Sequence, residues 1–562
     1  MDLKTKTSAE GEGARINLKI RAFVAGIVGM VVAFGLTELV HGLYQPVPSV
    51  LLAIVQQIIR LTPGGFATKA IETLGEADTP ILITFVVAAT LLIAGYLAYL
   101  SLRAWVMAFI GVGILAAIAI IASFAEPSAA PIATVLTVVG ALSLGSIVSG
   151  LLLRASGLLT FRFVSWPAST ESGTNGSPSQ GVRSREAHSA GGIAVNRRKF
   201  LVLSSGAALV GVAAAGVGRA LSGEVGEQRA SNPAPIQLPE PATSGAATHQ
   251  TLPPPPAEAS IDAPGMLPLI TPAKDFYLID TNLSSPRINV DDWSLKVKGA
   301  VDNPIELGYK DLLAMPTREA DITLSCVSNE VGGSLVSNGR WTGVLLSDVL
   351  AEAGVSREKI GSASEQLVGR SVDGWTSGFK TDLALDGREA LVAFGLNGDQ
   401  LPTKHGYPVR LVVPGLYGYV SATKWLTEIE LTNWDFDAYW IQRTWSKEGP
   451  IKTQSRIDTV KDGDRVSAGS VPVGGVAWAP HRGIERVEVS TDNGETWNEA
   501  KLADQLAADT WRQYVYNWDA KPGNYTLKVR ATDGEGETQA AKKTPPHPSG
   551  ATGYHTVDVT VV

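Results

Sequence analysis

Cysteine is nearly absent from this 562-residue sequence, which contains only Cys326. One cysteine cannot form an intramolecular disulfide, so the redox compartment cannot be inferred from disulfide bonds. It also excludes zinc ribbons, CxxCH haem attachment and iron–sulfur clusters that need several cysteine ligands. Positive charge is not in excess either, because the formal net charge is -7. Nucleic-acid binding usually requires a basic face, and we therefore expect no nucleic-acid partner.

Charge is almost absent from four long runs near the N-terminus. These runs are residues 22–44, 80–102, 104–124 and 131–153. Each has roughly the 20 apolar residues that a helix needs to span a bilayer. The series predicts a four-helix transmembrane anchor over residues 22–153, and buried helices of a soluble domain are the alternative. Residues 46–62 are also apolar but are bounded by prolines, so we expect them at the membrane interface.

Basic residues flank these runs unevenly. Lysines and arginines gather before the first run, Arg103 lies between the second and third, and Arg154 and Arg162 follow the fourth. Such flanks normally face the cytoplasm. This pattern predicts a multi-pass protein of the cell membrane, in contact with lipid, whose residues 1–21 form a cytoplasmic N-terminus.

The segment after the fourth run has two interpretations. Residues 154–195 include a Gly/Ser-rich stretch and are predicted to form a flexible cytoplasmic linker. The sequence N-R-R-K-F-L at 196–201 then precedes an apolar run, which resembles a twin-arginine export signal. A fifth transmembrane helix is the alternative for residues 196–221. Both interpretations place the following residues outside the cytoplasm, beginning with a Pro-rich tether at 222–268 that cannot bury a core.

Short strands and turns replace the helical pattern after the tether. Apolar residues occupy alternate positions from Trp293 to Lys298, which is typical of a half-buried strand, and short helices are expected at 309–315 and 345–353. The pattern predicts an α+β domain over 269–450. From residue 451 to 562 it becomes wholly β and predicts a β-sandwich.

The single cysteine lies in a polar, glycine-containing context. Ser325 to Asn329 is largely polar, and Gly332-Gly333 would let the backbone approach a large group. A thiolate is a soft donor suited to a redox metal. Cys326 is therefore the candidate metal ligand, and the ordinary alternative is a small buried apolar side chain.

A second candidate segment combines a buried strand with cations. His405 and Arg410 precede the strand residues L-V-V, and Lys424 follows them. An arginine can grip a phosphate with two hydrogen bonds while a lysine acts as a point charge. The segment is therefore a candidate anion site, and ordinary surface cations beside a strand are the alternative.

In this order, the segments resemble the sulfite oxidase family of molybdopterin-dependent oxidoreductases. The motifs that carry the resemblance are F-Y at 276–277, L-S-C-V-S-N at 324–329, N-G-R-W-T-G at 338–343, N-G-x-x-L-P at 397–402, H-G-Y-P-V-R at 405–410 and K-W-L at 424–426. Residues 486–497 look like part of the family's immunoglobulin-like dimerisation domain, which implies a homodimer. The likeness covers about 270–562 and is of the membrane-anchored, actinobacterial type.

The resemblance implies a fold of three parts and assigns roles to residues. The parts are an α-helical membrane bundle, an α+β molybdopterin domain and an immunoglobulin-like β-sandwich. Cys326 would be the catalytic residue and the protein ligand of the molybdenum. The cofactor-binding set would be Tyr277, Leu278, Asp280, Thr281, Cys326, His405, Arg410, Ser421, Ala422, Thr423 and Lys424. The expected activity is two-electron or oxygen-atom transfer on a small-molecule substrate at the extracytoplasmic side.

Electrons would pass to or from a separate protein or a quinone. His41 is the only histidine in the four spans, and a haem between membrane helices usually needs two, so no haem b is expected.

Departures from the family pattern leave the substrate open. Family arginines are replaced here by Glu330, Val331 and Ile279, and Trp445 stands where an active-site tyrosine is expected. Arg340 or Arg443 could supply the missing positive charge. A non-catalytic binding or receptor protein with the same fold is one rival. A transporter is another, but spans two to four lack the ionisable residues that transport pathways usually carry.

Overall fold

The computed structural model describes residues 3–74, 77–127, 129–156, 190–230 and 250–562. The chain forms two compact units, a helical unit of residues 1–61 and 74–227 and a β unit of residues 62–73 and 228–562. Most of the predicted cytoplasmic linker, at 157–189, and the tether segment at 231–249 lie outside the described residues.

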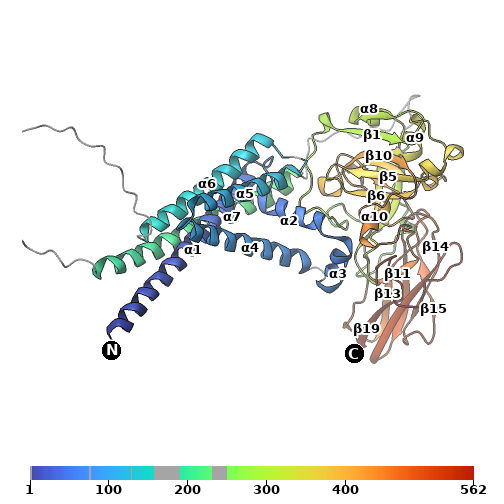
Figure 1. Cartoon of the computed structure of the whole chain (residues 1–562). Helices are drawn as coiled ribbons and strands as arrows, with labels where there is room; N and C mark the ends of the chain where they lie inside the picture. The colour runs from blue at the N-terminus through green and yellow to red at the C-terminus, as the bar shows by residue number, and fades with distance from the viewer. Residues whose placement is uncertain (1–2, 75–76, 128, 157–189, 231–249) are drawn as a thin grey trace, which may run out of the picture. The chain divides into compact units, whose positions relative to one another are not determined.

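Long helices occupy the predicted apolar runs (Figure 1). They are α1 (Leu3–Leu43), α4 (Asp78–Ser101), α5 (Trp105–Phe124), α6 (Pro131–Ala155) and α7 (Ala190–Ala230), with the shorter α2 (Val50–Leu61) and α3 (Gly64–Leu74) between α1 and α4. Among the described residues, five segments are long and apolar enough to cross a membrane, and Arg198–Ser222 of α7 is one of them. The prediction of helices over these runs is confirmed.

Helix α1 is the centre of the helical unit. Half of its apolar window is buried, against 22% or less for the other four. A Cβ atom on Gly35 would overlap the carbonyl oxygen of Gly211 in α7, and one on Gly42 would overlap that of Gly218. Paired glycines let two helices approach closely where apolar surroundings offer no other preference. Helix α7 therefore packs as a member of the bundle.

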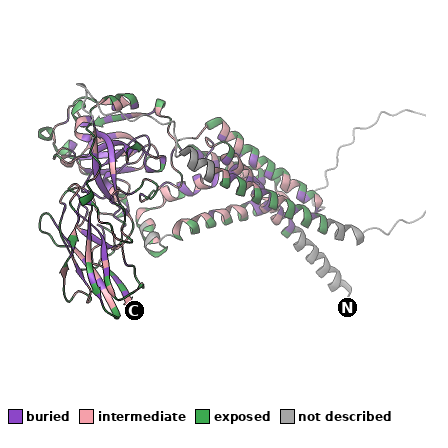
Figure 2. Ribbon diagram, turned by 180° about the vertical axis from the view of Figure 1, so that it is seen from behind, coloured by how far each residue is buried: buried purple, intermediate pink, exposed green. Residues whose placement is uncertain are grey.

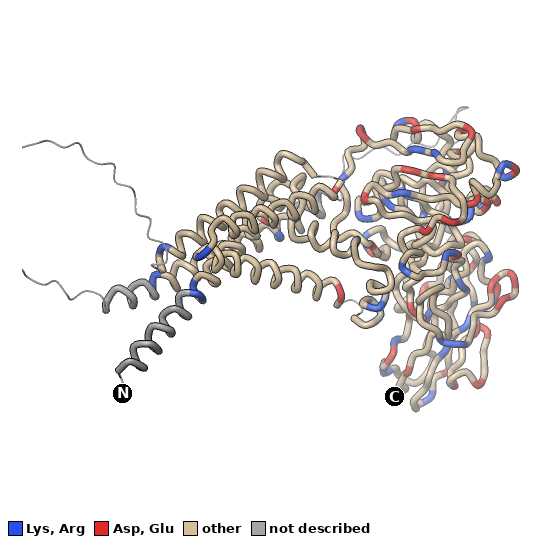
Figure 3. The backbone as a smooth tube through the Cα atoms, in the orientation of Figure 1, with Lys and Arg blue, Asp and Glu red and all other residues tan. Residues whose placement is uncertain are grey.

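Charged residues are rare along the described parts of these helices, as the colours of Figure 3 show. Glu38 of α1 is an exception, because its side chain is buried. Its Oε1 accepts a hydrogen bond from Ser49 Oγ at 2.7 Å, and Arg219 Nε of α7 lies 3.9 Å from its Oε2. This polar group joins α1, α7 and the residue that precedes α2.

Two five-stranded sheets form the first part of the β unit. One has the order β2 (Ile305–Gly308), β1 (Ser294–Gly299), β10 (Leu426–Thr432), β5 (Gln366–Ser371) and β6 (Thr376–Lys380). The other has the order β3 (Thr317–Ser325), β4 (Val336–Leu345), β7 (Leu391–Leu396) and β8 (Asp399–Gln400), with β9 (Arg410–Val412) also paired to β7. Short helices α8 (Tyr309–Ala314), α9 (Leu346–Glu352) and α10 (Gly418–Ser421) complete the predicted α+β pattern.

The burial of residues in these sheets follows the pattern of apolar residues in the sequence. In β1, Leu295 and Val297 are fully buried while Lys296 and Lys298 are exposed, so the alternation selects one face for the core. Every residue of β7 is buried, which agrees with its continuous apolar sequence. Figure 2 shows the buried residues concentrated in these sheets. The sheets thus form a dense support for the loops at their ends.

The second part of the β unit contains two further sheets. Their orders are β11 (Gln454–Ile457), β13 (Gly469–Trp478), β17 (Arg512–Ala520) and β16 (Lys501–Leu502), and then β12 (Arg465–Val466), β19 (His555–Val561), β18 (Gly523–Asp533), β14 (Ile484–Ser490) and β15 (Asn498–Glu499). Val473, Val487 and Val529 from the two sheets belong to one buried cluster. The predicted C-terminal β domain is confirmed, whereas its immunoglobulin-like character stays a prediction.

The predicted tether differs from the structure in its last part. Residues 250–268 pack on the β unit: Gln250 pairs with Arg318, and Ala259 is 1% exposed within the core. The backbone N–H of Ile261 donates to Gln513 at 2.6 Å. Proline-rich composition indicated an extended chain, and such a chain can still satisfy its polar groups against an existing surface.

Candidate active site

A cavity of about 110 Å³ lies in the β unit at the end of β3. This volume is roughly ten times what one water molecule requires, so the cavity can hold part of an organic group rather than a single ion. Seven of the predicted site residues line it. They are Tyr277, Asp280, Thr281, Cys326, Arg410, Ala422 and Lys424.

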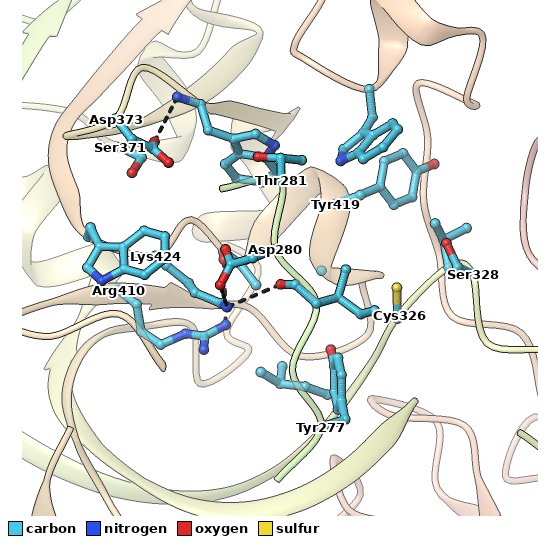
Figure 4. A pocket seen from close by; sticks show the side chains of 18 of the residues that line it. Tyr277, Asp280, Thr281, Cys326, Ser328, Ser371, Asp373, Arg410, Tyr419 and Lys424 are labelled. Atoms are coloured by element: carbon cyan, nitrogen blue, oxygen red, sulfur yellow. Dashed lines mark hydrogen bonds and ion pairs between the residues drawn. The ribbon is translucent and has the colours of Figure 1, made fainter. Parts of the chain in front are cut away.

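Cys326 follows β3 directly, and its backbone N–H donates to Leu335 O at 3.0 Å. The residue is 8% exposed, and Figure 4 shows its sulfur directed toward a space beside Tyr277, Ser328 and Tyr419. Burial raises the pKa of the thiol, while hydrogen bonding to Ser328 and the positive charge of Lys424 oppose this rise. A bound cation would favour the thiolate further.

Lys424 is held by three acceptors. Its Nζ donates to Asp280 Oδ2 at 2.8 Å, to Ile279 O at 3.1 Å and to Lys404 O at 3.1 Å. Burial lowers the pKa of Lys424 and raises that of Asp280, and the attraction between the two opposes both shifts. The ion pair therefore fastens the segment around Asp280 to the end of the cavity.

Arg410 is the second cation of the cavity and the first residue of β9. Its guanidinium donates to His405 O at 2.9 Å and lies 5.1 Å from the centre of the Trp341 ring. Burial lowers the pKa of Arg410 to about 10, so the side chain still carries its charge at neutral pH. A buried cation without a carboxylate in hydrogen-bond contact is suited to an anionic ligand.

His405 lies behind the cavity and is not part of its lining. It is 1% exposed, its Nε2 is 3.1 Å from Ala273 O, and its ring meets Phe276 edge to face. Burial and the nearby Arg410 lower the pKa of His405 to about 3. The neutral ring therefore supports the segment that carries Phe276 and Tyr277.

Three other predicted residues also lie away from the cavity lining. Leu278 is 45% exposed. Ser421 Oγ donates to Tyr417 O at 3.1 Å, and Thr423 Oγ1 shares a 2.6 Å hydrogen bond with Ser377 Oγ. In these contacts Ser421 and Thr423 brace the loop between β9 and β10, and their binding of a cofactor stays a prediction.

The sequence reasoning missed several residues of the cavity. Asp373 and Trp375 come from the turn between β5 and β6, and Tyr419 and Trp440 come from α10 and from a segment rich in aromatic residues. The D-G-W turn at 373–375 and the sequence W-D-F-D-A-Y-W at 434–440 were available signals. Neither has a spacing that indicates a site until the fold brings it to Cys326.

Of the four positions that depart from the family pattern, two line the cavity and two lie outside it. Ile279 and Trp445 line the cavity, whereas Glu330 and Val331 do not.

The two arginines that could supply positive charge to the site, Arg340 and Arg443, are held by other partners. Arg340 is bound by both carboxylate oxygens of Asp321, at 2.9 and 2.8 Å, and Arg443 lies 3.7 Å from the centre of the Tyr439 ring. Neither arginine lines the cavity. Each has a partner that holds it elsewhere, which the sequence could not indicate.

The donor set fits a metal that brings its own ligands. Within the described ranges, no group of three or more His, Cys, Asp or Glu side chains could hold a metal ion. A metal at Cys326 would then need most of its ligands from a cofactor, and Arg410 and Lys424 lie in the same cavity to receive an anionic part of it.

Comparison with known proteins identifies this type of domain. Residues 282–440 match the family model "Oxidoreductase molybdopterin binding domain", and residues 447–544 match "Mo-co oxidoreductase dimerisation domain". The chain is 32% identical over 304 residues to mitochondrial sulfite oxidase of Homo sapiens, covering 46% of this chain and 55% of the relative. It is 26% identical over 302 residues to sulfite oxidase of Arabidopsis thaliana, covering 44% of this chain and 76% of the relative.

The chain thus spans about half the length of the mammalian relatives that it matches. Among solved structures, the sulfane dehydrogenase SoxCD of Paracoccus pantotrophus matches with a TM-score of 0.46 and 23% identity, over 53% of this chain and 82% of that one. The two family models and the sulfite oxidases of animals and plants agree with the cavity around Cys326. By these matches, residues 282–440 form a molybdopterin-binding oxidoreductase domain, and the chain is similar to the sulfite oxidases of animals and plants.

Proposed function

We propose that this chain is a molybdenum-cofactor oxidoreductase that carries out two-electron or oxygen-atom transfer on a small molecule. The observation that carries the proposal is the buried thiol of Cys326 facing a cavity that also contains Arg410 and Lys424. The cofactor, when bound, supplies the two-electron chemistry, while the protein supplies orientation, access and electrostatics.

The residues of the cavity have separate roles in this proposal. Cys326 ligates the molybdenum, and Arg410 and Lys424 receive the phosphate of the pterin. Tyr277 and Thr281 close over the cofactor from the N-terminal side, where the Lys424–Asp280 ion pair fixes their segment. Ala422 allows close approach on the opposite side because its side chain is small.

The remaining predicted residues act through the backbone or through neighbours. The His405 ring supports Phe276, and Ser421 and Thr423 hold the loop that presents Ala422 and Lys424. Leu278 is exposed beside Tyr277, where it can cover the edge of a bound pterin.

We also propose that the helical unit anchors the protein in the cell membrane with the β unit on the extracytoplasmic side. The five apolar helices found in the described part of the chain support the anchor. The glycine contacts between α1 and α7 favour a resident fifth helix at 196–221 over a signal that is cleaved. Phe200, from the arginine-containing motif, is 4% exposed in a cluster with Ala22 and Leu153, and this burial supports the same choice.

Partners follow from the same proposal. A two-electron reaction needs a redox partner, which is a separate electron-transfer protein or a membrane quinone. The match of residues 447–544 to a dimerisation domain supports a homodimer. The alternative function is a non-catalytic receptor on the same fold, in which the cavity would bind a ligand without a metal.

Metal content tests this proposal directly. Native protein produced with its cofactor pathway should contain about one molybdenum per chain by mass spectrometry, because one cavity holds one Cys326. Cys326→Ser replaces sulfur by a harder oxygen and should lose the metal or all activity. Thermal unfolding of the variant is the control for folding. A folded native protein without molybdenum would refute the enzyme and support the receptor.

A further inference from the structure

Cys326 is the first residue of the cysteine loop, residues 326–335, which connects β3 with β4. Loops between paired antiparallel strands usually have about two to five residues, so this one is long. Inside it, the Cys326 N–H donates to Leu335 O at 3.0 Å, and the Leu335 N–H donates to Asn329 Oδ1 at 2.8 Å. The loop also contains two adjacent glycines, which have the most conformational freedom to lose. Contacts from outside the loop must therefore help to fix the direction of the thiol.

The strand that leads into Cys326 is held by the C-terminal part of the β unit. The Thr323 N–H donates to Asp509 O at 2.9 Å, and Thr323 Oγ1 accepts a hydrogen bond from the Trp511 N–H at 2.7 Å. Thr323 lies in the region that matches the molybdopterin-binding model, whereas Asp509 and Trp511 lie in the region that matches the dimerisation model. The two matched regions therefore meet just before the thiol.

An arginine of β11 holds the loop after Cys326. Arg456 Nη1 donates to Gly333 O at 2.6 Å, and Arg456 Nε donates to Asp458 Oδ1 at 2.6 Å. The side chains of Arg456 and Asp458 are 7% and 9% exposed, so this ion pair is largely buried. A hydrogen bond from a charged donor is stronger than a neutral one. The pair therefore supplies a strong donor to the loop, and the carboxylate balances its charge.

A histidine of β19 lies against the neighbouring residue of the loop. Gly332 has a φ of 80°, and a Cβ atom there would overlap the ring of His555. The ring is itself held, because its Nδ1 accepts a hydrogen bond from the Ile457 N–H at 3.0 Å. The sequence predicted that Gly332-Gly333 lets the backbone approach a large group. In the structure neither glycine lines the cavity, and the group that Gly332 approaches is this ring of the protein.

We infer that the C-terminal domain positions the Cys326 thiol within each chain, and that Arg456 and His555 are positioning residues. The domain holds β3 before Cys326 and the cysteine loop after it. A loop held on both sides presents its sulfur to the cavity in one direction (Figure 4). For the metal-bound state the inference rests on the proposed function, because the direction of the sulfur then sets the metal–sulfur bond.

Alkylation tests the inference without a metal, since Cys326 is the only cysteine of the chain. The metal-free full chain in detergent is treated with iodoacetamide at several low concentrations of urea. The double variant Arg456→Met with Asp458→Asn removes the donor to Gly333 and leaves no unpaired charge. We expect alkylation at least roughly tenfold faster, the effect of losing one hydrogen bond to a charged group. The faster rate should hardly change with urea, because local opening of a loop exposes little surface.

Arg482 and Asp533 provide a matched pair in the same domain. They form an ion pair at 2.9 Å with a fully buried carboxylate, and Arg482 donates to Ile451 O, outside the cysteine loop. Arg482→Met with Asp533→Asn should leave the alkylation rate at low urea within about twofold of the native rate. The inference would be overturned by equal rates in the two double variants, or by an acceleration that rises steeply with urea as global unfolding does.

A second variant keeps the test available if the first double variant fails to fold. Gly332→Ala places a methyl group against the His555 ring. Its control is Gly463→Ala, because Gly463 has a φ of 81° and no described atom lies within 4 Å of an added Cβ. Both alanines have the same backbone strain, so faster alkylation is expected in Gly332→Ala alone. Equal rates in the two would contradict the contact with His555 as a positioning contact.

The molybdenum-loaded chain separates the inference from the proposed function. The bond of a soft thiolate to an oxidised metal absorbs visible light, and a displaced sulfur changes this absorption. At equal molybdenum content, we expect a changed band in the Arg456 double variant and the native band in the Arg482 double variant. An unchanged band in both would overturn the inference. Native protein that takes up no molybdenum would refute the proposed function, while the alkylation rates would still decide whether the C-terminal domain positions the thiol.

Discussion

The helical unit and the β unit use burial in opposite ways. At its closest contacts the helical unit places glycine against glycine, as in Gly35 with Gly211. The β unit contains a cavity whose lining includes the cations Arg410 and Lys424. In a bilayer, where we propose that the helical unit lies, apolar side chains gain little by leaving lipid for protein, so close backbone contact would hold the helices. In water, burial of apolar strands supplies the main driving force, and the β unit can keep costly charges in its interior.

In each unit, a polar pair joins distant segments. Glu38 and Arg219 connect α1 with α7, and Asp280 and Lys424 connect the segment before β1 with the loop before β10. Arg219 is 59% exposed, whereas Lys424 is 14% exposed. The comparison indicates that a buried ion pair holds segments of the β unit together, whereas close packing holds the helices of the helical unit together.

Removing one charge from the cavity should have the largest effect. Lys424→Met leaves Asp280 largely buried without its cation, and we expect a loss of about 3 kcal/mol in the free energy of unfolding together with loss of cofactor. The matched control is Lys447→Met, which breaks an ion pair with Asp437, a carboxylate that is 54% exposed. That variant should cost less than about 1 kcal/mol. Equal losses in denaturant titrations would mean that charge is no more structural in the cavity than at the surface.

The second largest effect is expected from overpacking the contact between α1 and α7. A Cβ on Gly211 would lie 2.7 Å from the backbone oxygen of Val31, so Gly211→Leu should force α7 away from α1 at a cost of about 1–3 kcal/mol. Gly216, on the same helix, has nothing within 4 Å of such an atom, and Gly216→Leu is the control.

The measurement is co-purification after cutting the chain at a protease site inserted between residues 172 and 181. In detergent, an N-terminal tag should retain the β unit in the native chain and in Gly216→Leu, and lose it in Gly211→Leu. Retention in all three would contradict a glycine-dependent contact between α1 and α7.

Much of the fold could be predicted because it depends on local patterns. The helical runs, the alternation in β1 and the β character after residue 451 follow from periodicity and turn residues. The motif around Cys326 was also recognisable from its neighbours. What could not be predicted depends on contacts between distant residues. Arg340 is removed from the site by Asp321, and residues 250–268 pack on strands far along the chain.

Contacts between distant residues also decide where the aromatic residues of the cavity lie. Trp445 was identified as a departure from a family pattern, but its partners His547 and Tyr419 come from other parts of the chain. The spacing of residues in the sequence carries no information on such contacts. The contacts of His405 with Ala273 and Phe276 likewise could not be predicted, and its binding of the cofactor stays a prediction.

The smallest expected effect comes from protonation of His405, which lies behind the cavity. The pKa of His405 falls from 6.5 to about 3 on folding, so between these values the unfolded chain binds a proton that the folded chain does not. Stability of the cofactor-free protein is therefore complete above pH 6.5 and falls as the pH decreases, by roughly 2 kcal/mol at pH 5. His405→Gln keeps a donor for Ala273 O and should remove this part of the pH dependence. His555, whose pKa falls to about 4, is partly buried in the C-terminal domain, and His555→Gln serves as an independent comparison. Denaturant titrations at pH 7 and pH 5 measure both. If the stability difference between pH 7 and pH 5 is unchanged in His405→Gln, folding does not lower the pKa of His405, and the neutral support behind Phe276 would then be wrong.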